Sequence, residues 1–144
     1  MKTDNRSNGG RFEQRLSKIL SKAGFWVHVM QQNKAGQPAD IVAVKGRYHT
    51  LIDCKVISNG KGFPFRRIEE NQRLAMGMFT KRCDEACWFA LELPDKSIWM
   101  LSMNTIRKME SAEMKGISEE ELRRHPWTIE EWLKSADVWS VGDV

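Results

Sequence analysis

The chain is organised around the stretch QPADIVAVKGRYHTLIDCK, which runs from Gln37 to Lys55. Its apolar run at residues 41–44 is typical of a buried strand, and residues 48–57 predict a second strand. The Lys-Gly-Arg between them, at residues 45–47, has the composition of a tight turn. The stretch therefore predicts a β-hairpin.

Two carboxylates fall within this hairpin, Asp40 near the start of the first strand and Asp53 on the second. Because side chains alternate across a strand, Asp53 and Lys55 emerge on one face and Cys54 on the other. Either acid alone has an ordinary explanation, as a turn former or as part of a solvated strand face. Two acids and a lysine in an otherwise apolar hairpin are costly to desolvate, so together they predict a divalent-metal site with a cationic neighbour.

The donor chemistry indicates which metal such a site would take. Carboxylate oxygens without a thiolate or histidine cluster favour Mg²⁺, with Mn²⁺ as a substitute. Beside the metal, Lys55 can orient or deprotonate a water, or neutralise negative charge, and the sequence leaves these roles open. The three cysteines, Cys54, Cys83 and Cys87, lack a paired Cys-x-x-Cys spacing and are interpreted as reduced thiols.

A helix predicted at residues 68–82 adds a polar group to the same region. Ile68, Gln72, Ala75 and Phe79 follow helical spacing, so Gln72 shares the face that turns towards the sheet. A glutamine on an apolar face needs a partner, which the metal site and its waters would supply. Gln72 is therefore a candidate catalytic residue that positions a water or a phosphate oxygen.

The pattern Pro38, Asp40, Asp53 and Lys55 resembles the PD-(D/E)XK nuclease superfamily. Within it, the chain is most similar to RecU-type and related phage and archaeal Holliday junction resolvases. GFPFRRIEENQ at residues 62–72 resembles the segment that follows Glu-x-Lys in that family. Gly-Arg-Phe-Glu at residues 10–13 resembles its opening helix, and the resemblance covers roughly residues 9–93.

This resemblance implies an α/β fold with a restriction-endonuclease-like mixed β-sheet core flanked by helices. It implies a metal-dependent DNA endonuclease that leaves 5′-phosphate and 3′-hydroxyl ends. It also implies that Glu13 supports the metal site, and that the backbone carbonyl of Cys54 is a further ligand beside Asp40 and Asp53. A four-way junction is close to two-fold symmetric, so a homodimer with two sites would fit it.

The distribution of charge favours a polyanionic partner. Residues 1–83 carry 16 Lys and Arg against 6 Asp and Glu, whereas residues 84–144 carry 7 against 13. A basic half that also holds the carboxylates suits DNA, although basic residues also simply solvate helices and loops. The candidate DNA-binding residues are Arg11, Lys34, Lys61, Arg66, Arg67 and Arg73.

The remaining sequence predicts one domain in three parts: a flexible basic arm at residues 1–9, the nuclease core at 10–110, and an acidic helical extension at 111–144. The extension would pack on the core or on a dimer partner. Capping-box patterns begin two of its helices, at Ser118 with Glu121 and at Thr128 with Glu131. The other expected elements are a helix at 10–23, a strand at 25–30, a hairpin of 86–93 with 97–102, and a helix at 104–109.

Other classes of protein fit less well. No apolar run approaches the ~20 residues of a membrane span, and the polar start does not resemble a secretion signal. The expected location is the cytoplasm of a bacterial, archaeal or phage-infected host cell.

Two departures from the family leave alternatives open. Asp53 stands where glutamate is commoner, and no long insertion provides the family's junction-entering stalk. One alternative is a phage or mobile-element nicking or restriction-type nuclease acting on duplex or flapped DNA. The other is a non-catalytic DNA-binding protein on the same scaffold, which the intact Asp40, Asp53, Lys55 and Gln72 disfavour.

Overall fold

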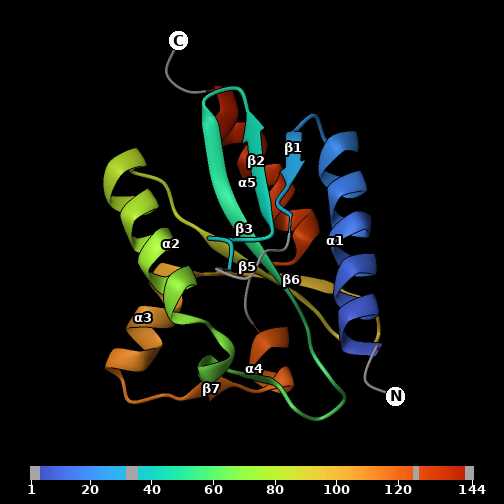
Figure 1. The fold of residues 1–144 in the computed structure, drawn as a ribbon, viewed down its shortest axis with the longest axis vertical. Helices are drawn as coiled ribbons and strands as arrows, with labels where there is room; N and C mark the ends of the chain where they lie inside the picture. Colours follow the sequence, from blue (N-terminus) through green and yellow to red (C-terminus); the bar gives the residue numbers. More distant parts are fainter. Residues whose placement is uncertain (1–3, 32–35, 125–126, 142–144) are drawn as a thin grey trace.

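The computed structural model describes residues 4–31, 36–124 and 127–141. Its centre is a five-stranded sheet in the order β1-β2-β3-β5-β6 (Figure 1). The strands are β1 (Trp26–Val29), β2 (Ile41–Lys45), β3 (Tyr48–Val56), β5 (Trp88–Glu92) and β6 (Ile98–Ser102). Neighbouring strands are antiparallel except β3 and β5, which are parallel. The sheet is therefore mixed, as the sequence predicted.

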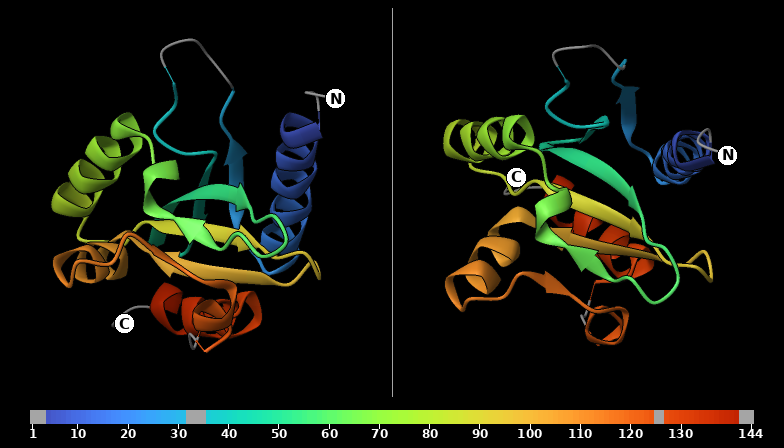
Figure 2. Two further views of the ribbon diagram at one scale, coloured as in Figure 1. Left: turned by 90° about the horizontal axis from the view of Figure 1, so that it is seen from below. Right: turned by 60° about the horizontal axis from the view of Figure 1, so that its bottom comes forward.

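Helices cover both faces of this sheet. Figure 1 shows α1 (Asp4–Lys22) and α2 (Glu70–Cys83) on opposite sides of β1 to β3. One hydrophobic cluster joins the sheet to α1 and α5 (Ile129–Val141). A second joins the other face to α2 and α3 (Met103–Ser111). In the turned views of Figure 2, α2 and α3 lie on one side of the molecule and α1 on the other. This arrangement confirms the predicted α/β class.

The predicted hairpin at the centre of the sequence is confirmed. Strands β2 and β3 pair antiparallel, with Lys45 opposite Tyr48, so Gly46 and Arg47 alone make the turn. Gly46 adopts φ +58°, a left-handed conformation that glycine allows at little cost. The tight turn fixes the register of the two strands, on which the position of the two aspartates depends.

The predicted hairpin of β5 and β6 and the strand β1 are also present. The ends of α1 and α2 differ from expectation: α1 begins at Asp4, so residues 4–9 of the expected arm are helical, and α2 begins at Glu70. A second, two-stranded sheet was not predicted. It pairs β4 (Phe63–Pro64) with β7 (Gly116–Ile117), and two-residue strands leave too little pattern to detect.

The acidic C-terminal segment packs onto the core. Trp132 of α5 is fully buried and contacts the rings of Phe25, Tyr48 and Trp88. Ser118 and Glu121 form the predicted capping box of α4 (Glu119–Arg123), and the Thr128 hydroxyl accepts from the Glu131 amide. Within the described residues, no helix is long and apolar enough to cross a membrane.

Candidate active site

The β2–β3 register brings the two predicted aspartates together. Ile41 lies opposite Ile52, and the Asp40 amide donates a 3.1 Å hydrogen bond to the Ile52 carbonyl. Asp40 therefore stands beside Asp53 at the end of the ladder, and both side chains are buried. The predicted juxtaposition of the two acids is present.

Asp40 is held at both of its carboxylate oxygens. Oδ2 accepts a 2.7 Å hydrogen bond from the backbone amide of Cys54, and Oδ1 accepts a 3.3 Å bond from Nε2 of Gln37. Each oxygen has a second lone pair, so both donors leave capacity for a cation. These contacts fix the rotamer of Asp40 within the sheet.

Asp53 is 1% exposed and lies between Gln72 and Lys55. Its Oδ1 accepts a 2.7 Å hydrogen bond from Nε2 of Gln72. The Lys55 ammonium lies 3.1 Å from Oδ2, but this ion pair lacks hydrogen-bond geometry, and Oδ2 is buried without a hydrogen-bond donor. A buried carboxylate oxygen with spare capacity is what a cation site requires.

Glu13 reaches the same cluster from α1. Burial, with the charge of Asp40 adding to it, raises the pKa of Glu13 to about 7. Burial is also the main cause that raises the pKa of Asp53 to about 8; Asp40 adds to this increase and Lys55 opposes it. Three carboxyls that resist sharing negative charge in a buried place would be stabilised by a divalent cation.

The donor set fits a hard cation. The Cys54 side chain packs in the core on the α1 side, where burial raises the pKa of its thiol well above the ordinary value. Its thiolate is thus a poor ligand, whereas the carbonyl is a hard oxygen donor. In the described part of the chain, no three His, Cys, Asp or Glu side chains form a ready metal cluster. The side-chain donors that fit are the pair Asp40 and Asp53, with Glu13 interacting with Asp40 beside them.

Gln72 owes its position to the start of α2. Glu69 and Gln72 form a capping box, in which the Glu69 amide donates to Gln72 Oε1 at 3.2 Å. The same amide group of Gln72 then has its Nε2 free to reach Asp53. The helical spacing correctly placed Gln72 on the buried face of the helix.

The predicted DNA-binding residues lie in different environments. Arg66 and Lys61 are exposed. Arg67 donates a 3.1 Å hydrogen bond to the Val56 carbonyl, one residue beyond Lys55, which places its guanidinium at the active edge of the sheet. Lys34 lies outside the described residues.

Arg73 has a partner within the protein. It binds Glu110 of α3 through two 2.9 Å hydrogen bonds, so its guanidinium joins two helices. The sequence could not reveal this pairing, because the two residues are far apart in the chain and no local pattern links them. Its predicted contact with DNA would have to compete with that ion pair.

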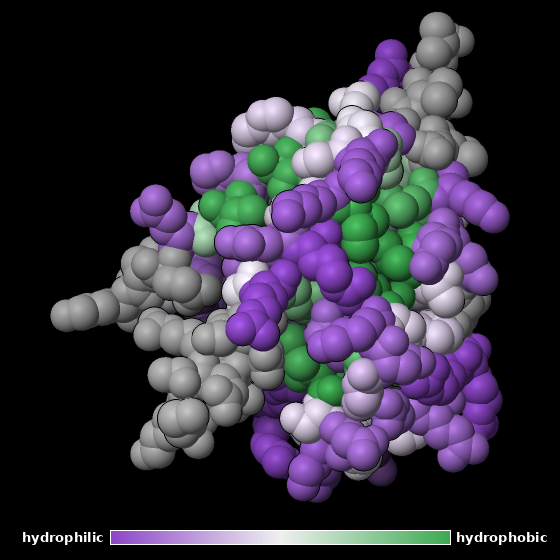
Figure 3. Space-filling view, turned by 90° about the vertical axis from the view of Figure 1, so that its right-hand side faces the viewer, coloured by the Kyte–Doolittle hydropathy of each residue, from purple (hydrophilic) through white to green (hydrophobic). Residues whose placement is uncertain are grey.

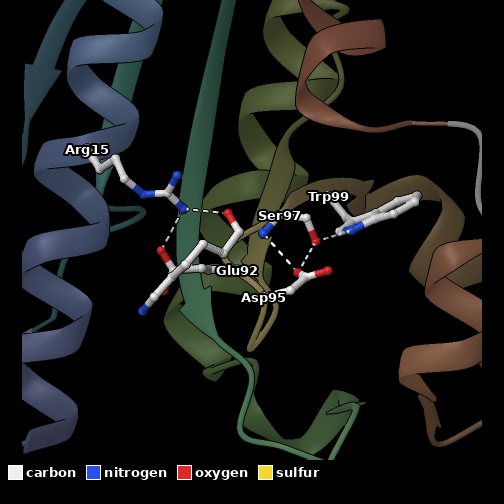
Figure 4. A network of polar contacts seen from close by, with 6 residues as sticks. Arg15, Glu92, Asp95, Ser97 and Trp99 are labelled. Atoms are coloured by element: carbon white, nitrogen blue, oxygen red, sulfur yellow. Dashed lines mark hydrogen bonds and ion pairs between the residues drawn. The ribbon is translucent and has the colours of Figure 1, made fainter.

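A polar network ties the helix that carries Glu13 to the sheet (Figure 4). Arg15 donates to Glu92 at 2.7 Å and to the Lys96 carbonyl at 2.9 Å. Asp95 accepts from Ser97, whose hydroxyl accepts from the Trp99 indole. The contacts of Arg15 anchor α1 on the β5–β6 hairpin, and those of Asp95 and Ser97 lie within that hairpin.

The side of the molecule on which α1 lies is largely hydrophilic with smaller apolar patches (Figure 3). Arg11 lines a cavity of about 440 Å³ together with Arg15, Lys96 and Glu92. Three cations against one acid give this cavity the charge that a phosphate would prefer.

Comparison with known proteins agrees with this site. A family model for archaeal Holliday junction resolvases (Hjc) matches residues 4–134. The chain belongs to this family. Among solved structures it is similar to Hjc of Archaeoglobus fulgidus, a Holliday junction resolvase from an archaeal hyperthermophile, at 25% identity with a TM-score of 0.57. The match covers 78% of this chain and 89% of that one. No curated protein sequence matches the chain.

Membership of the Hjc family confirms the resemblance drawn from Pro38, Asp40, Asp53 and Lys55. It assigns the chain to the Holliday junction resolvases, nucleases that act on branched DNA. Two residues beside the site had no predicted part in orienting the aspartates: Gln37 and Asn71. Their role is visible only from their contacts in the structure. In the sequence, Gln37 is an ordinary loop residue and Asn71 an ordinary residue at the start of a helix.

Proposed function

We propose that the protein is a Mg²⁺-dependent homodimeric Holliday junction resolvase that leaves 5′-phosphate and 3′-hydroxyl ends. The single observation that carries the proposal is the buried pair Asp40 and Asp53, with Oδ2 of Asp53 lacking a hydrogen-bond donor. The Lys55 ammonium offsets only part of the repulsion between these two neighbouring buried carboxylates, and a hard divalent cation would offset the rest. The enzyme would meet its DNA substrate in the cytoplasm of a bacterial, archaeal or phage-infected host cell.

The metal would be held by Asp40, Asp53 and the Cys54 carbonyl, with Glu13 in support. When bound, it supplies Lewis-acid stabilisation of phosphate charge and makes water more acidic. Lys55 stands 3.1 Å from Asp53 with a largely covered side chain. As an ammonium it can orient the attacking water or neutralise charge on the phosphate, and as a neutral amine it can deprotonate the water. Gln72 holds Asp53 in place through one amide atom and is itself held through the other.

The homodimer is supported by apolar surface on α2. Leu74 is 65% exposed and Met78 59% exposed, on the side of the helix away from Gln72. Paired burial of this face would remove apolar area from water in both subunits. Among the large hydrophobic side chains that the structure shows to be exposed, Trp26 of β1 is the aromatic one.

The decisive experiment compares a labelled mobile four-way junction with a linear duplex of the same arms. Each is incubated with Mg²⁺, with EDTA, and with the Asp53→Asn variant, which removes a carboxylate ligand and keeps the shape. Paired symmetric nicks in the junction alone, lost in both controls while junction binding stays within about tenfold, are expected.

Other outcomes select the alternatives. Equal cutting of junction and duplex would indicate a nicking or restriction-type nuclease, which the absence of a stalk insertion keeps in view. Junction binding that survives EDTA, without cleavage in Mg²⁺ or Mn²⁺, would indicate a non-catalytic DNA-binding protein.

A further inference from the structure

The first turn of α2 contacts Asp53 itself and the loop that precedes Asp40. Gln72 donates directly to Asp53, as described above. Its neighbour Asn71 points its side-chain amide at the loop before Asp40, and Nδ2 donates a 3.0 Å hydrogen bond to the Gln37 carbonyl. Two consecutive residues of one helical turn thus meet the two segments that carry the acids.

Gln37 passes this contact on to Asp40. Gln37 is 9% exposed, and its Nε2 donates a 3.3 Å hydrogen bond to Asp40 Oδ1. Asn71 fixes the backbone of Gln37, and the side chain of Gln37 fixes one oxygen of Asp40. The other oxygen is fixed by the Cys54 amide. Asp40 therefore has one support from its own sheet and one that originates in α2.

The loop is shaped for this approach. Gly36 adopts φ +79°, and a Cβ placed there would come within 2.7 Å of Asn71 Nδ2. Any other side chain at this position would push Asn71 away from Gln37. The missing Cβ gives the Asn71 amide room to reach the backbone of the loop.

We propose that Asn71 is a positioning residue that orients Asp40 for metal binding through Gln37, so that one turn of α2 sets both metal-binding aspartates. The inference rests on the proposed function, since it needs Asp40 to be a ligand. Partners of metal ligands typically contribute 10- to 100-fold to metal affinity, because they hold the ligand in its binding rotamer. Asn71 would contribute to metal affinity indirectly, through Gln37.

The test measures Mn²⁺ binding to the full chain without DNA, by isothermal titration calorimetry. The variants are Asn71→Ala, Gln37→Ala, the double variant and Gly36→Ala. Glu70→Gln is the matched control, because Glu70 is an exposed polar residue of the same turn. The melting temperature in EDTA is recorded for each, so that a loss of fold is separated from a loss of metal affinity.

Each single variant is expected to bind Mn²⁺ about tenfold more weakly, with Glu70→Gln unchanged. The double variant is expected to bind Mn²⁺ at most about twofold more weakly than the weaker-binding single variant. The two effects should not multiply, because Asn71 acts through Gln37. Gly36→Ala should resemble Asn71→Ala.

Wild-type affinity in a folded Asn71→Ala or Gln37→Ala variant would overturn the inference, as would losses that multiply in the double variant. If Asn71→Ala does not fold, Gln37→Ala decides alone. A wild type that binds no Mn²⁺, or binds it equally well after Asp53→Asn, would instead overturn the proposed metal site itself.

Discussion

The side-chain amide of Gln72 donates a 2.7 Å hydrogen bond to Oδ1 of Asp53, across from the ammonium of Lys55. The bond joins the helix that follows the central hairpin to the strand that carries Asp53 and Lys55. It holds one oxygen of Asp53 and leaves the other, Oδ2, without a hydrogen-bond donor. Helix α2 thereby decides which oxygen is available to a cation.

Gln72→Ala should lower cleavage and stability together. The change leaves a buried oxygen of Asp53 without its donor, which costs about 1–3 kcal/mol of unfolding free energy in EDTA. Urea denaturation measures that cost, and junction cleavage in Mg²⁺ should fall at least tenfold because Asp53 loses its fixed rotamer. Lys81→Ala, at an exposed position of the same helix, is the control for stability. Equal unfolding free energies for Gln72→Ala and wild type would contradict the structural part.

The stability of the metal-free protein should fall as pH rises from about 4 to about 8. The pKa of Asp53 rises on folding from 3.8 to about 8, so the folded chain binds the proton more tightly than the unfolded chain across this range. Glu13 acts in the same direction, from 4.5 to about 7. Melting temperatures in EDTA at pH 5, 6, 7 and 8 measure the slope.

Two controls accompany this pH series. Asp53→Asn should reduce the slope and leave the part due to Glu13, because one of the two titrating groups is gone. Mg²⁺ should raise the melting temperature more at pH 8 than at pH 5. Identical slopes for the variant and the wild type would show that another group dominates.

The double change Arg66→Ala with Arg67→Ala should weaken junction binding and flatten its salt dependence. Each lost phosphate contact lowers the magnitude of the salt slope by about 1, so the pair should lower it by about 2. Arg73→Ala is the matched control: its guanidinium already binds Glu110, so it should lose stability rather than salt dependence. An unchanged slope after the double change would remove this pair from the DNA surface.

Leu74→Asp with Met78→Asp should convert a dimer to a monomer. The two side chains provide the exposed apolar face of α2, and buried aspartates at a two-fold interface would repel each other. Sedimentation equilibrium measures the mass. Trp26→Asp, on strand β1, is the control and should remain dimeric. A double variant that still sediments as a dimer would place the interface elsewhere.

Local sequence patterns were enough to predict the central part of the site. The hairpin and the strand with Asp53 and Lys55 depend on alternation and turn composition, which neighbouring residues encode. The turn was predicted at residues 45–47, and strand pairing shortens it to Gly46 and Arg47. The face of α2 that carries Gln72 follows from helical spacing for the same reason. The fold class followed from these elements together with the resemblance that they supported.

Other features depend on contacts between segments that are distant in the chain. The pairing of Arg73 with Glu110, the hold of Asn71 on Gln37, and the two-stranded sheet of β4 and β7 arise only when the helices dock. No local pattern encodes them, because a single polar residue or a two-residue strand has many possible partners before folding. The composition and periodicity of the chain thus determined its elements and the candidate metal-binding residues. Tertiary packing decided which groups hold the oxygens of each aspartate and which arginine is already paired.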